Sequence, residues 1–204
     1  MNKTDKGELT RRHILDTGRR LVLHKGFIGV GLKEILDASG VPKGSFYHYF
    51  SSKENFGCVL LEQYVDDYEQ RLDSLLHPSA GSGRERLMRY WKAWIDDPAM
   101  GGWAEHCLVV KLAAEVADLS EDMRLILCAG VTRLVSRIAE TMADGQRDGS
   151  LPSTLESQPL AQTLYQLWLG AALLCKLSRD KAPLHQALTM TERLLAPRGV
   201  QANA

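Results

Sequence analysis

Basic, hydroxyl and aromatic side chains gather in the sequence KGSFYHY, which starts at residue 43. Lys43, Ser45, Tyr47 and His48 offer groups of the kinds that contact phosphate oxygens and base edges of DNA. Gly44 lets a sugar-phosphate chain approach the backbone closely. In a helix, Tyr47 and His48 point away from the apolar side chains of the run, which favours contact with an external partner.

Neighbouring residues extend this pattern. Tyr49 ends the run and Lys53 starts the next predicted element, where helix amides and a lysine suit a phosphate oxygen. Lys33 adds a cation in the preceding short helix, and we include it among the expected DNA contacts. A structural alternative stays open, because Phe46 and Phe50, four residues apart, fit a core face and the rings between them would complete a core aromatic cluster.

The four cysteines, at positions 58, 107, 128 and 175, are a second possible site of chemistry. Their spacing matches no metal site, so we expect free thiols, no metal and no cofactor. Cys107 lies soon after Trp103 at the predicted start of a helix, where the helix dipole favours a thiolate. The plain alternative is that all four are small buried hydrophobic residues.

Lys176 is unusual because it lies in the apolar run LWLGAALLCKLS. Its ammonium group either extends to the surface or is partly desolvated beside an anion. A Cys107 thiolate facing Lys176 would explain both residues, and Lys111 is close to Cys107 in sequence. We therefore take Cys107, Lys176, Trp103 and Lys111 as candidates for a small-molecule sensor.

The elements that must position these residues are all helices, since apolar residues recur with a period of about 3.6 and no strand alternation is evident. Two short helices joined by a turn with Gly40 form a helix-turn-helix, and the helix before them completes a three-helix head. We expect an all-α protein with this head in residues 1–52 and a larger helical body in residues 53–204. The predicted helices are 9–25, 32–39, 43–49, 53–76, 84–96, 103–117, 120–147, 157–178 and 182–195.

Residues 26–54, GFIGVGLKEILDASGVPKGSFYHYFSSKE, resemble the DNA-binding signature of the TetR family of repressors, and the part VPKGSFYHYFSSKE is very specific. The resemblance implies a homodimeric all-α repressor that binds operator DNA and responds to a small-molecule inducer, with residues 53–204 as its regulatory and dimerisation body. It implies base and backbone contacts by Lys43, Ser45, Tyr47 and His48, and phosphate contacts by Tyr49 and Lys53.

Three residues depart from the family pattern. Val30 and Gly31 stand where the family usually has two hydroxyl residues before the second helix, so Val30 offers no hydroxyl to a phosphate. Gly31 is a tolerable N-cap. Gly18 replaces the usual alanine, and we expect it to pack closely against a neighbouring helix.

Residues 107–124, CLVVKLAAEVADLSEDMR, resemble the N-ethylmaleimide-responsive subgroup of the family, whose members sense electrophiles. This resemblance implies release from DNA when an electrophile or oxidant modifies Cys107. The alternative is a non-covalent aromatic or acyl ligand in an apolar pocket of the body. Its candidate lining residues are Tyr90, Trp91, Trp94, Trp103, Tyr165 and Trp168.

The predicted helix 157–178 carries a broad apolar stripe that an isolated subunit would expose, which argues for association. In the family the last two long helices pair with those of a second subunit. The competing interpretation is that the stripe meets only its own core. The expected dimer contacts are Leu160, Leu164, Leu167, Trp168 and Ala171.

Composition fits an ordinary globular chain of 204 residues, with 45% hydrophobic and 25% charged residues. The net charge of zero hides an asymmetry, since residues 1–60 hold ten Lys and Arg against six Asp and Glu. No apolar run approaches the roughly 20 residues of a membrane span, and the first residues lack a signal-peptide core, so we expect a cytoplasmic protein. Motifs of hydrolases, metalloproteases and nucleotide-binding enzymes are missing, which argues against an enzyme.

Overall fold

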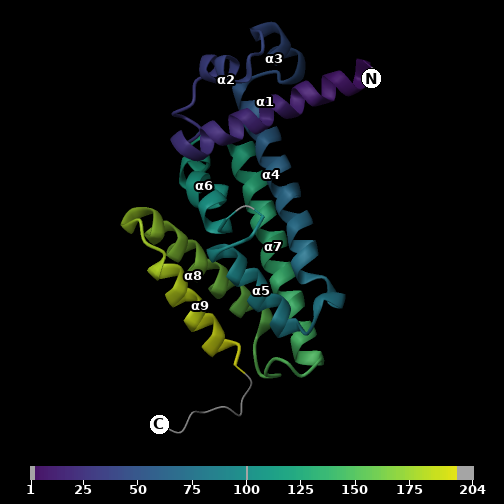
Figure 1. Cartoon of the computed structure of the whole chain (residues 1–204), viewed down its shortest axis with the longest axis vertical. Helices are drawn as coiled ribbons and strands as arrows, with labels where there is room; N and C mark the ends of the chain where they lie inside the picture. The colour runs from purple at the N-terminus through teal and green to yellow at the C-terminus, as the bar shows by residue number, and fades with distance from the viewer. Residues whose placement is uncertain (1–2, 100, 197–204) are drawn as a thin grey trace. The chain divides into compact units, whose positions relative to one another are not determined.

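The computed structural model describes residues 3–99 and 101–196, and these are helical apart from short connections (Figure 1). The predicted all-α class is confirmed, and none of the helices described is long and apolar enough to cross a membrane. The elements are α1 (Lys3–Lys25), α2 (Leu32–Ser39), α3 (Lys43–Tyr49), α4 (Lys53–Leu76), η1 (Pro78–Ala80), α5 (Gly83–Ile95), η2 (Trp103–His106), α6 (Leu108–Leu119), α7 (Glu121–Arg147), α8 (Ser157–Ser178) and α9 (Ala182–Leu194).

One predicted helix, 103–117, is wrong at its start. Residues Trp103–His106 form a short 3₁₀ turn, and α6 begins only at Leu108. Cys107 between them has extended backbone angles, φ −72° and ψ 109°, which break the helical path. The Trp103 ring is buried and its indole N–H donates to Asp97 Oδ2 at 2.5 Å, so this turn is held by the core and by a loop residue.

The chain divides into two compact units, and each is described by itself. The first comprises residues up to 66 together with 111–129, and the second comprises 67–110 with the residues from 130 onward. The three-helix head therefore shares its unit with half of α4 and parts of α6 and α7. The predicted boundary between residues 52 and 53 separates the DNA-binding head from the regulatory body, and it stays a prediction.

Aromatic packing explains why the first half of α4 belongs to the same unit as the head. The Phe56 ring lies 5.6 Å from Phe46 and 5.1 Å from Phe50 between ring centroids, and all three side chains are fully buried. A Cβ atom on Gly18 of α1 would come within 2.3 Å of the Phe56 ring. The expected close packing at Gly18 is thus confirmed, and an alanine there would require the phenylalanine to move.

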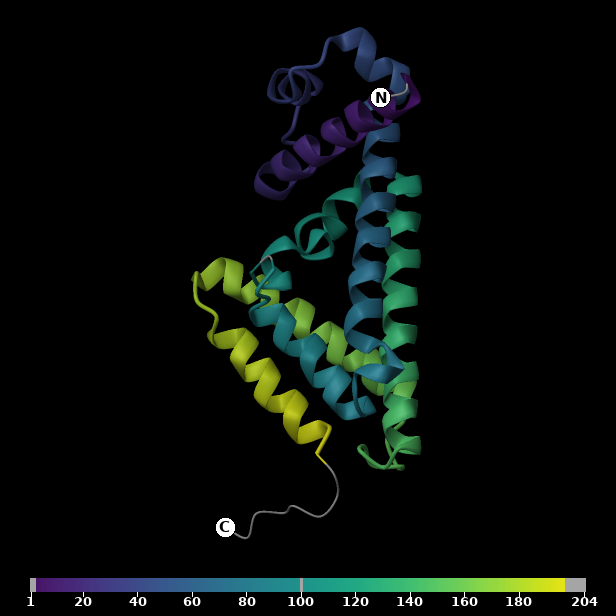
Figure 2. The same ribbon diagram turned by 45° about the vertical axis from the view of Figure 1, so that its right-hand side comes forward.

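The second unit is built around α5, α8 and α9. α8 and α9 lie side by side, and α5 packs against α9 (Figure 2). Its core is rich in large rings, with Trp91 of α5 stacked on Trp168 of α8 at 5.0 Å between centroids and 16° between planes. Burying rings of this size supplies much of the apolar contact area of such a core.

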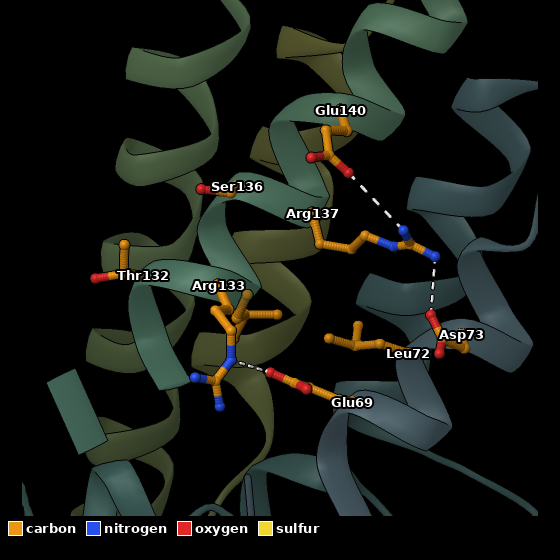
Figure 3. A pocket seen from close by; sticks show the side chains of 9 residues that line it. Glu69, Leu72, Asp73, Thr132, Arg133, Ser136, Arg137 and Glu140 are labelled. Atoms are coloured by element: carbon orange, nitrogen blue, oxygen red, sulfur yellow. Dashed lines mark hydrogen bonds and ion pairs between the residues drawn. The ribbon is translucent and has the colours of Figure 1, made fainter. Parts of the chain in front are cut away.

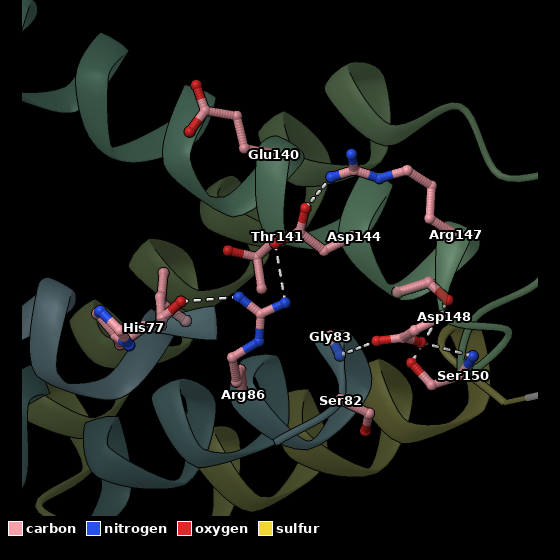
Figure 4. Close-up of polar contacts among 12 residues, drawn as sticks. His77, Ser82, Gly83, Arg86, Glu140, Thr141, Asp144, Arg147, Asp148 and Ser150 are labelled. Atoms are coloured by element: carbon pink, nitrogen blue, oxygen red, sulfur yellow. Dashed lines mark hydrogen bonds and ion pairs between the residues drawn. The ribbon is translucent and has the colours of Figure 1, made fainter. Parts of the chain in front are cut away.

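A buried arginine joins the end of α4 to α7 within this unit (Figure 4). Arg86 is 3% exposed; its guanidinium donates to the Leu76 carbonyl at 2.8 Å and pairs with Asp144 at 2.8 Å. At the start of α5, Ser82 and Glu85 form a capping box, and the Gly83 N–H donates to Asp148 at 2.7 Å. These contacts satisfy polar groups that would otherwise be buried without partners.

A shallow groove runs between α4 and α7, and Figure 3 shows the charged side chains along it. Arg133 pairs with Glu69, and Arg137 pairs with Asp73 at 2.8 Å. These side chains are 40% to 66% exposed, and exposed ion pairs of this kind contribute little to stability. None of the side chains that line this groove indicates a binding site for a ligand.

Replacing Asp144 by alanine should lower the free energy of unfolding by about 3 kcal/mol, because it leaves the Arg86 charge buried without its partner. Glu140→Ala is the matched control: Glu140 lies on the same helix and pairs with Arg137 at 3.8 Å in an exposed position. That change should cost about 0.5 kcal/mol or less. Urea unfolding of both variants measures the difference, and equal costs would contradict the structural role of Arg86.

Candidate DNA interface and sensor site

The head holds α2 and α3 through a small core and two turns. Ile35 and Phe46 are fully buried, and the Ser39 hydroxyl donates to the Ile35 carbonyl at 2.7 Å. Gly40 ends α2 in the left-handed region at φ 65°, and Pro42 precedes α3 with extended backbone. The structure thus forms the helix-turn-helix where the sequence predicted it, with Gly40 and Pro42 in the turn between the two helices.

The core of the head fixes which side of α3 faces solvent. Phe46 and Phe50 are both 0% exposed, whereas Tyr47 is 46% exposed and His48 is exposed. The alternative in which the tyrosine and histidine join the core cluster is therefore wrong for residues 47 and 48. The exposed row leaves hydroxyl and imidazole groups available to an external partner.

The other α3 residues extend this exposed surface. Lys43 and Gly44 are exposed, and the Lys43 ammonium lies 5.9 Å from the centre of the Tyr47 ring. Ser45 and Tyr49 are half-buried. We call the residues Lys43, Gly44, Ser45, Tyr47, His48 and Tyr49 the α3 surface.

Two predicted DNA contacts, Lys33 and Lys53, already have partners inside the chain. Lys33 pairs with Asp37 at 2.6 Å, and this hydrogen bond and charge raise the pKa of Lys33. The Lys53 ammonium donates to the Phe27 carbonyl at 2.8 Å and lies 4.6 Å from the centre of the Phe27 ring. Burial lowers the pKa of Lys53. A phosphate would have to compete with these partners or share the ammonium groups with them.

Val30 is fully buried, so the departure from the family pattern at this position places an apolar side chain in the core of the head. Gly31 is the N-cap of α2 and makes no side-chain capping bond. A phosphate contact from a hydroxyl at position 30 is therefore missing in this protein.

Glu115 of α6 binds the turn between α1 and α2, and nothing in the sequence predicted this. Its carboxylate accepts the backbone N–H of Phe27 at 3.1 Å and that of Ile28. Gly26 has φ 79°, and a Cβ atom there would lie 2.8 Å from Glu115 Oε2, so both its backbone angles and its lack of a side chain serve this contact. No local pattern marks the glutamate, because its partners are 87 and 88 residues away.

Lys111, predicted near the sensor thiol, instead reaches the end of α1. Its ammonium group donates to the His24 carbonyl at 3.1 Å. Cations near a helix C-terminus interact favourably with the unpaired carbonyls and the helix dipole. Lys111 and Glu115 together attach α6 to the residues that lead into the helix-turn-helix.

Cys107 lies directly before α6, as the sequence suggested. Its side chain is 3% exposed, and its sulfur accepts the N–H of Val110 at 3.5 Å in the manner of an N-cap. Negative charge is favoured at this position by the helix N-terminus. Cys107 belongs to the same core cluster as Trp103.

The remaining thiols differ in their surroundings. Burial raises the pKa of Cys58, and the charges of Asp122, Glu54 and Glu62 raise it further, which makes Cys58 a poor nucleophile. Cys128 is exposed. Cys175 and Lys176 line one hollow beside η2, and Cys107 is not among the side chains that line it. The pairing of Cys107 with Lys176 stays a prediction.

The predicted dimer stripe on α8 lies mostly in the core of its own unit. Leu164 and Trp168 are 0% exposed and Ala171 is 6% exposed, so these three are covered without a second subunit. Leu160 is half-buried and only Leu167 is exposed. A different face of α8 carries the exposed apolar side chains, which are Leu167, Leu173, Leu174 and Leu177.

Glu115→Ala should lower the free energy of unfolding by about 1–3 kcal/mol, because two backbone N–H groups lose a charged acceptor. Asp118→Ala, an exposed change on the same helix, should stay within about 0.5 kcal/mol of the parent. Urea unfolding gives the energies, and amide exchange of Phe27 and Ile28 locates the change. Unaltered exchange at these two amides would show that the carboxylate does not hold the turn.

Comparison with known proteins places this geometry in a family. Residues 14–56 match the model of the bacterial regulatory proteins of the TetR family, and residues 83–191 match the tetracycline repressor-like C-terminal domain. The chain is 42% identical over 196 residues to the transcriptional repressor NemR of Escherichia coli K12, covering 96% of this chain and 98% of the relative.

Two solved structures agree with this match. The crystal structure of the reduced form of E. coli NemR has a TM-score of 0.85 and 42% identity, over 94% of this chain and 99% of that one. A transcriptional regulator assigned to the TetR/AcrR family has a TM-score of 0.83 and 55% identity, over 92% and 99% of the two chains. The chain belongs to the TetR family of bacterial regulatory proteins.

Proposed function

We propose that this protein is a transcriptional repressor that binds operator DNA as a homodimer through the α3 surface and is released when an electrophile or oxidant modifies Cys107. The observation that carries the DNA-binding part is the burial of Phe46 in α3 and of Phe50 directly after it, while Tyr47 and His48 are exposed. The similar proteins from E. coli and Mycobacterium are transcriptional repressors, which agrees with this role.

Gly44 supports the approach of a DNA backbone to α3. A Cβ atom on Gly44 would meet nothing within 4 Å, so packing inside the protein gives no reason for a glycine at this position. A bare backbone at the first turn of a recognition helix allows close contact with a sugar-phosphate chain. Lys43 beside it contributes a cation for the same polyanion.

The exposed leucines of α8 favour a second copy of the chain as the partner of the body. Leu173, Leu174 and Leu177 are 50%, 53% and 75% exposed, and Met190 and Leu194 of α9 are also exposed. Apolar residues that cluster on a surface in this way mark an interaction site. A symmetric dimer would present two α3 surfaces to half-sites about 34–36 Å apart.

The sensor proposal rests on the position of Cys107 at the start of α6. The helix N-terminus favours the thiolate, and the crystal structure of E. coli NemR is that of its reduced form. α6 also carries Lys111 and Glu115, which bind residues at the end of α1 and in the turn before α2. A modification that shifts the first turn of α6 would therefore disturb contacts that support the head.

A non-covalent ligand is the alternative. The aromatic core of the second unit would have to open to admit it, since Trp91, Trp94 and Trp168 are at most 1% exposed. A covalent adduct can provide the roughly 5.5 kcal/mol that moves a two-state equilibrium from 1:99 to 99:1. Because the relatives are repressors, catalytic turnover forms no part of this proposal, and we expect a cytoplasmic location.

Tyr47→Ala or His48→Ala should weaken binding to DNA from upstream of the gene about 10- to 100-fold, because each removes a base-edge contact. Lys43→Ala should weaken binding to all sequences and reduce the salt dependence by about one counterion. Lys92→Ala, an exposed change on α5, is the control and should have no effect. Fluorescence anisotropy across a salt series measures all four, and undiminished affinity in the α3 variants would contradict the proposed interface.

Cys107→Ser should bind DNA like the parent protein but stay bound after treatment with N-ethylmaleimide or p-benzoquinone, because serine does not form the adduct. Cys128→Ser removes an exposed thiol and should still be released. Intact-protein mass spectrometry identifies the adduct, and anisotropy follows release. Release of the Cys107→Ser variant at the parental dose would exclude the thiol switch and favour the non-covalent alternative.

A further inference from the structure

A small hollow lies between η2 and the turn that joins α8 to α9, inside the second unit. Its volume is about 270 Å³, slightly below the roughly 300–1,000 Å³ of pockets that take drug-sized ligands. Its apolar lining comes from Ala104, Ala172 and Leu184, which are buried, and from Cys175, which is half-buried. The other lining residues are charged and exposed: Glu105, Lys176, Arg179, Asp180 and Lys181.

The core-facing row of α8 continues into this hollow. Tyr165, Trp168 and Ala172 are buried and follow one another at intervals of three and four residues, which places them on one face of the helix. Cys175 and Arg179 continue the row at the same intervals. An apolar side chain would be expected at the last position of such a row, and this chain has a guanidinium group there.

The backbone of Arg179 also favours a different residue. As the C-cap of α8 it has φ 56° and ψ 34°, the left-handed region in which helices usually end with glycine. Among the residues that the structure describes, it is the only one besides glycine with a positive φ. A side chain raises the free energy of this conformation. An arginine at such a position therefore indicates a use for its side chain.

The two carboxylates of the hollow already have partners. Glu105 pairs with Lys181 at 3.1 Å, and the Lys181 ammonium also donates to the Ile95 carbonyl at 3.0 Å. Asp180 Oδ1 accepts the N–H of Ala182 at 3.1 Å, at the start of α9. These contacts attach one lysine and both acidic side chains to the protein itself.

The other two cations differ in this respect. Within residues 3–99 and 101–196, no carboxylate pairs with Lys176 or Arg179, and their side chains make no hydrogen bond. An ammonium and a guanidinium group therefore stand three residues apart beside an apolar lining, and both have room for an external acceptor.

We propose that Lys176 and Arg179 bind the carboxylate of a small aliphatic monocarboxylic acid, whose alkyl chain lies on Ala104, Ala172 and Leu184. The planar guanidinium group suits a carboxylate because two parallel N–H groups can donate to its two oxygens. This site does not include the Cys107 thiol, and the proposed function does not depend on it.

The lining of the hollow selects this class of ligand. Inorganic phosphate is hydrated on all sides and would gain nothing from the buried alanines and the leucine. An uncharged molecule of the same size would leave both cations without an acceptor, and an organic cation would be repelled by them. The volume of the hollow excludes a long fatty acid. A short chain with one carboxylate satisfies both the charged groups and the apolar lining.

The test uses butyrate as the probe and the full-length protein. Amide chemical shifts of Ala104 and Ala172, followed by NMR during a titration, should change with butyrate and reach saturation. Butyramide has nearly the same shape without the charge, and it should bind at least about tenfold more weakly. Absence of saturation with butyrate would contradict the proposal, and so would equal affinity for butyramide or inorganic phosphate.

Lys176→Gln and Arg179→Gln should each weaken butyrate binding about three- to tenfold, because each removes a charged donor that is partly exposed to solvent. Lys92→Gln removes an exposed lysine of α5 and is the matched control, with parental affinity expected. Parental affinity in both Lys176→Gln and Arg179→Gln would overturn the assignment.

Arg179→Gly separates binding from a structural role of the arginine. Glycine adopts the left-handed angles without a steric penalty, so this variant should unfold at a higher temperature than the parent in the absence of ligand. It should nevertheless bind butyrate as weakly as Arg179→Gln. A glycine variant that keeps the parental affinity would contradict the proposal. Cys107→Ser should bind butyrate like the parent, so a failure here and a failure of the thiol switch are distinguishable.

Discussion

The contact of Phe46 and Phe50 with Phe56 determines the orientation of α3, and the proposed function depends on it. Because Phe46 of α3 and Phe50 directly after it are completely buried against Phe56 of α4, the helix cannot turn about its axis without exposing Phe46. Tyr47 and His48 consequently face outward. The close approach of Gly18 to Phe56 makes α1 part of the same constraint. The interface is therefore specified by apolar packing, and its polar side chains only occupy the places that this packing leaves open.

The fold was largely predictable because it depends on local signals. Glycine at position 40, proline at position 42 and the period of the apolar residues predicted the bounds of α2 and α3 as the structure has them. The start of α6 was not predictable in this way. Leu108 begins the helix because the Trp103 ring enters the core and its indole binds Asp97, and a tertiary contact of this kind leaves no periodic trace in the sequence.

The site was predictable only in part, for the same reason. Outward residues of a short helix follow from its apolar face, so the α3 surface emerged from the sequence. Glu115 did not, since its partners are backbone amides far away in the chain. Part of the predicted dimer stripe lies inside the subunit because α8 has two apolar faces, and periodicity alone does not say that Trp168 packs inside the subunit while Leu177 is exposed.

The spacing of Lys111 and Glu115 on α6 has a consequence for how the protein can vary. Successive residues of a helix are rotated by about 100°, so residues four apart lie on the same face, and the lysine meets the His24 carbonyl while the carboxylate meets the Phe27 and Ile28 amides. One residue gained or lost between the two would turn one of them away from its partner while leaving both ends of the helix intact. Substitutions between them are therefore easier to accommodate than a change in their number, and homologues that share both contacts should align here without gaps.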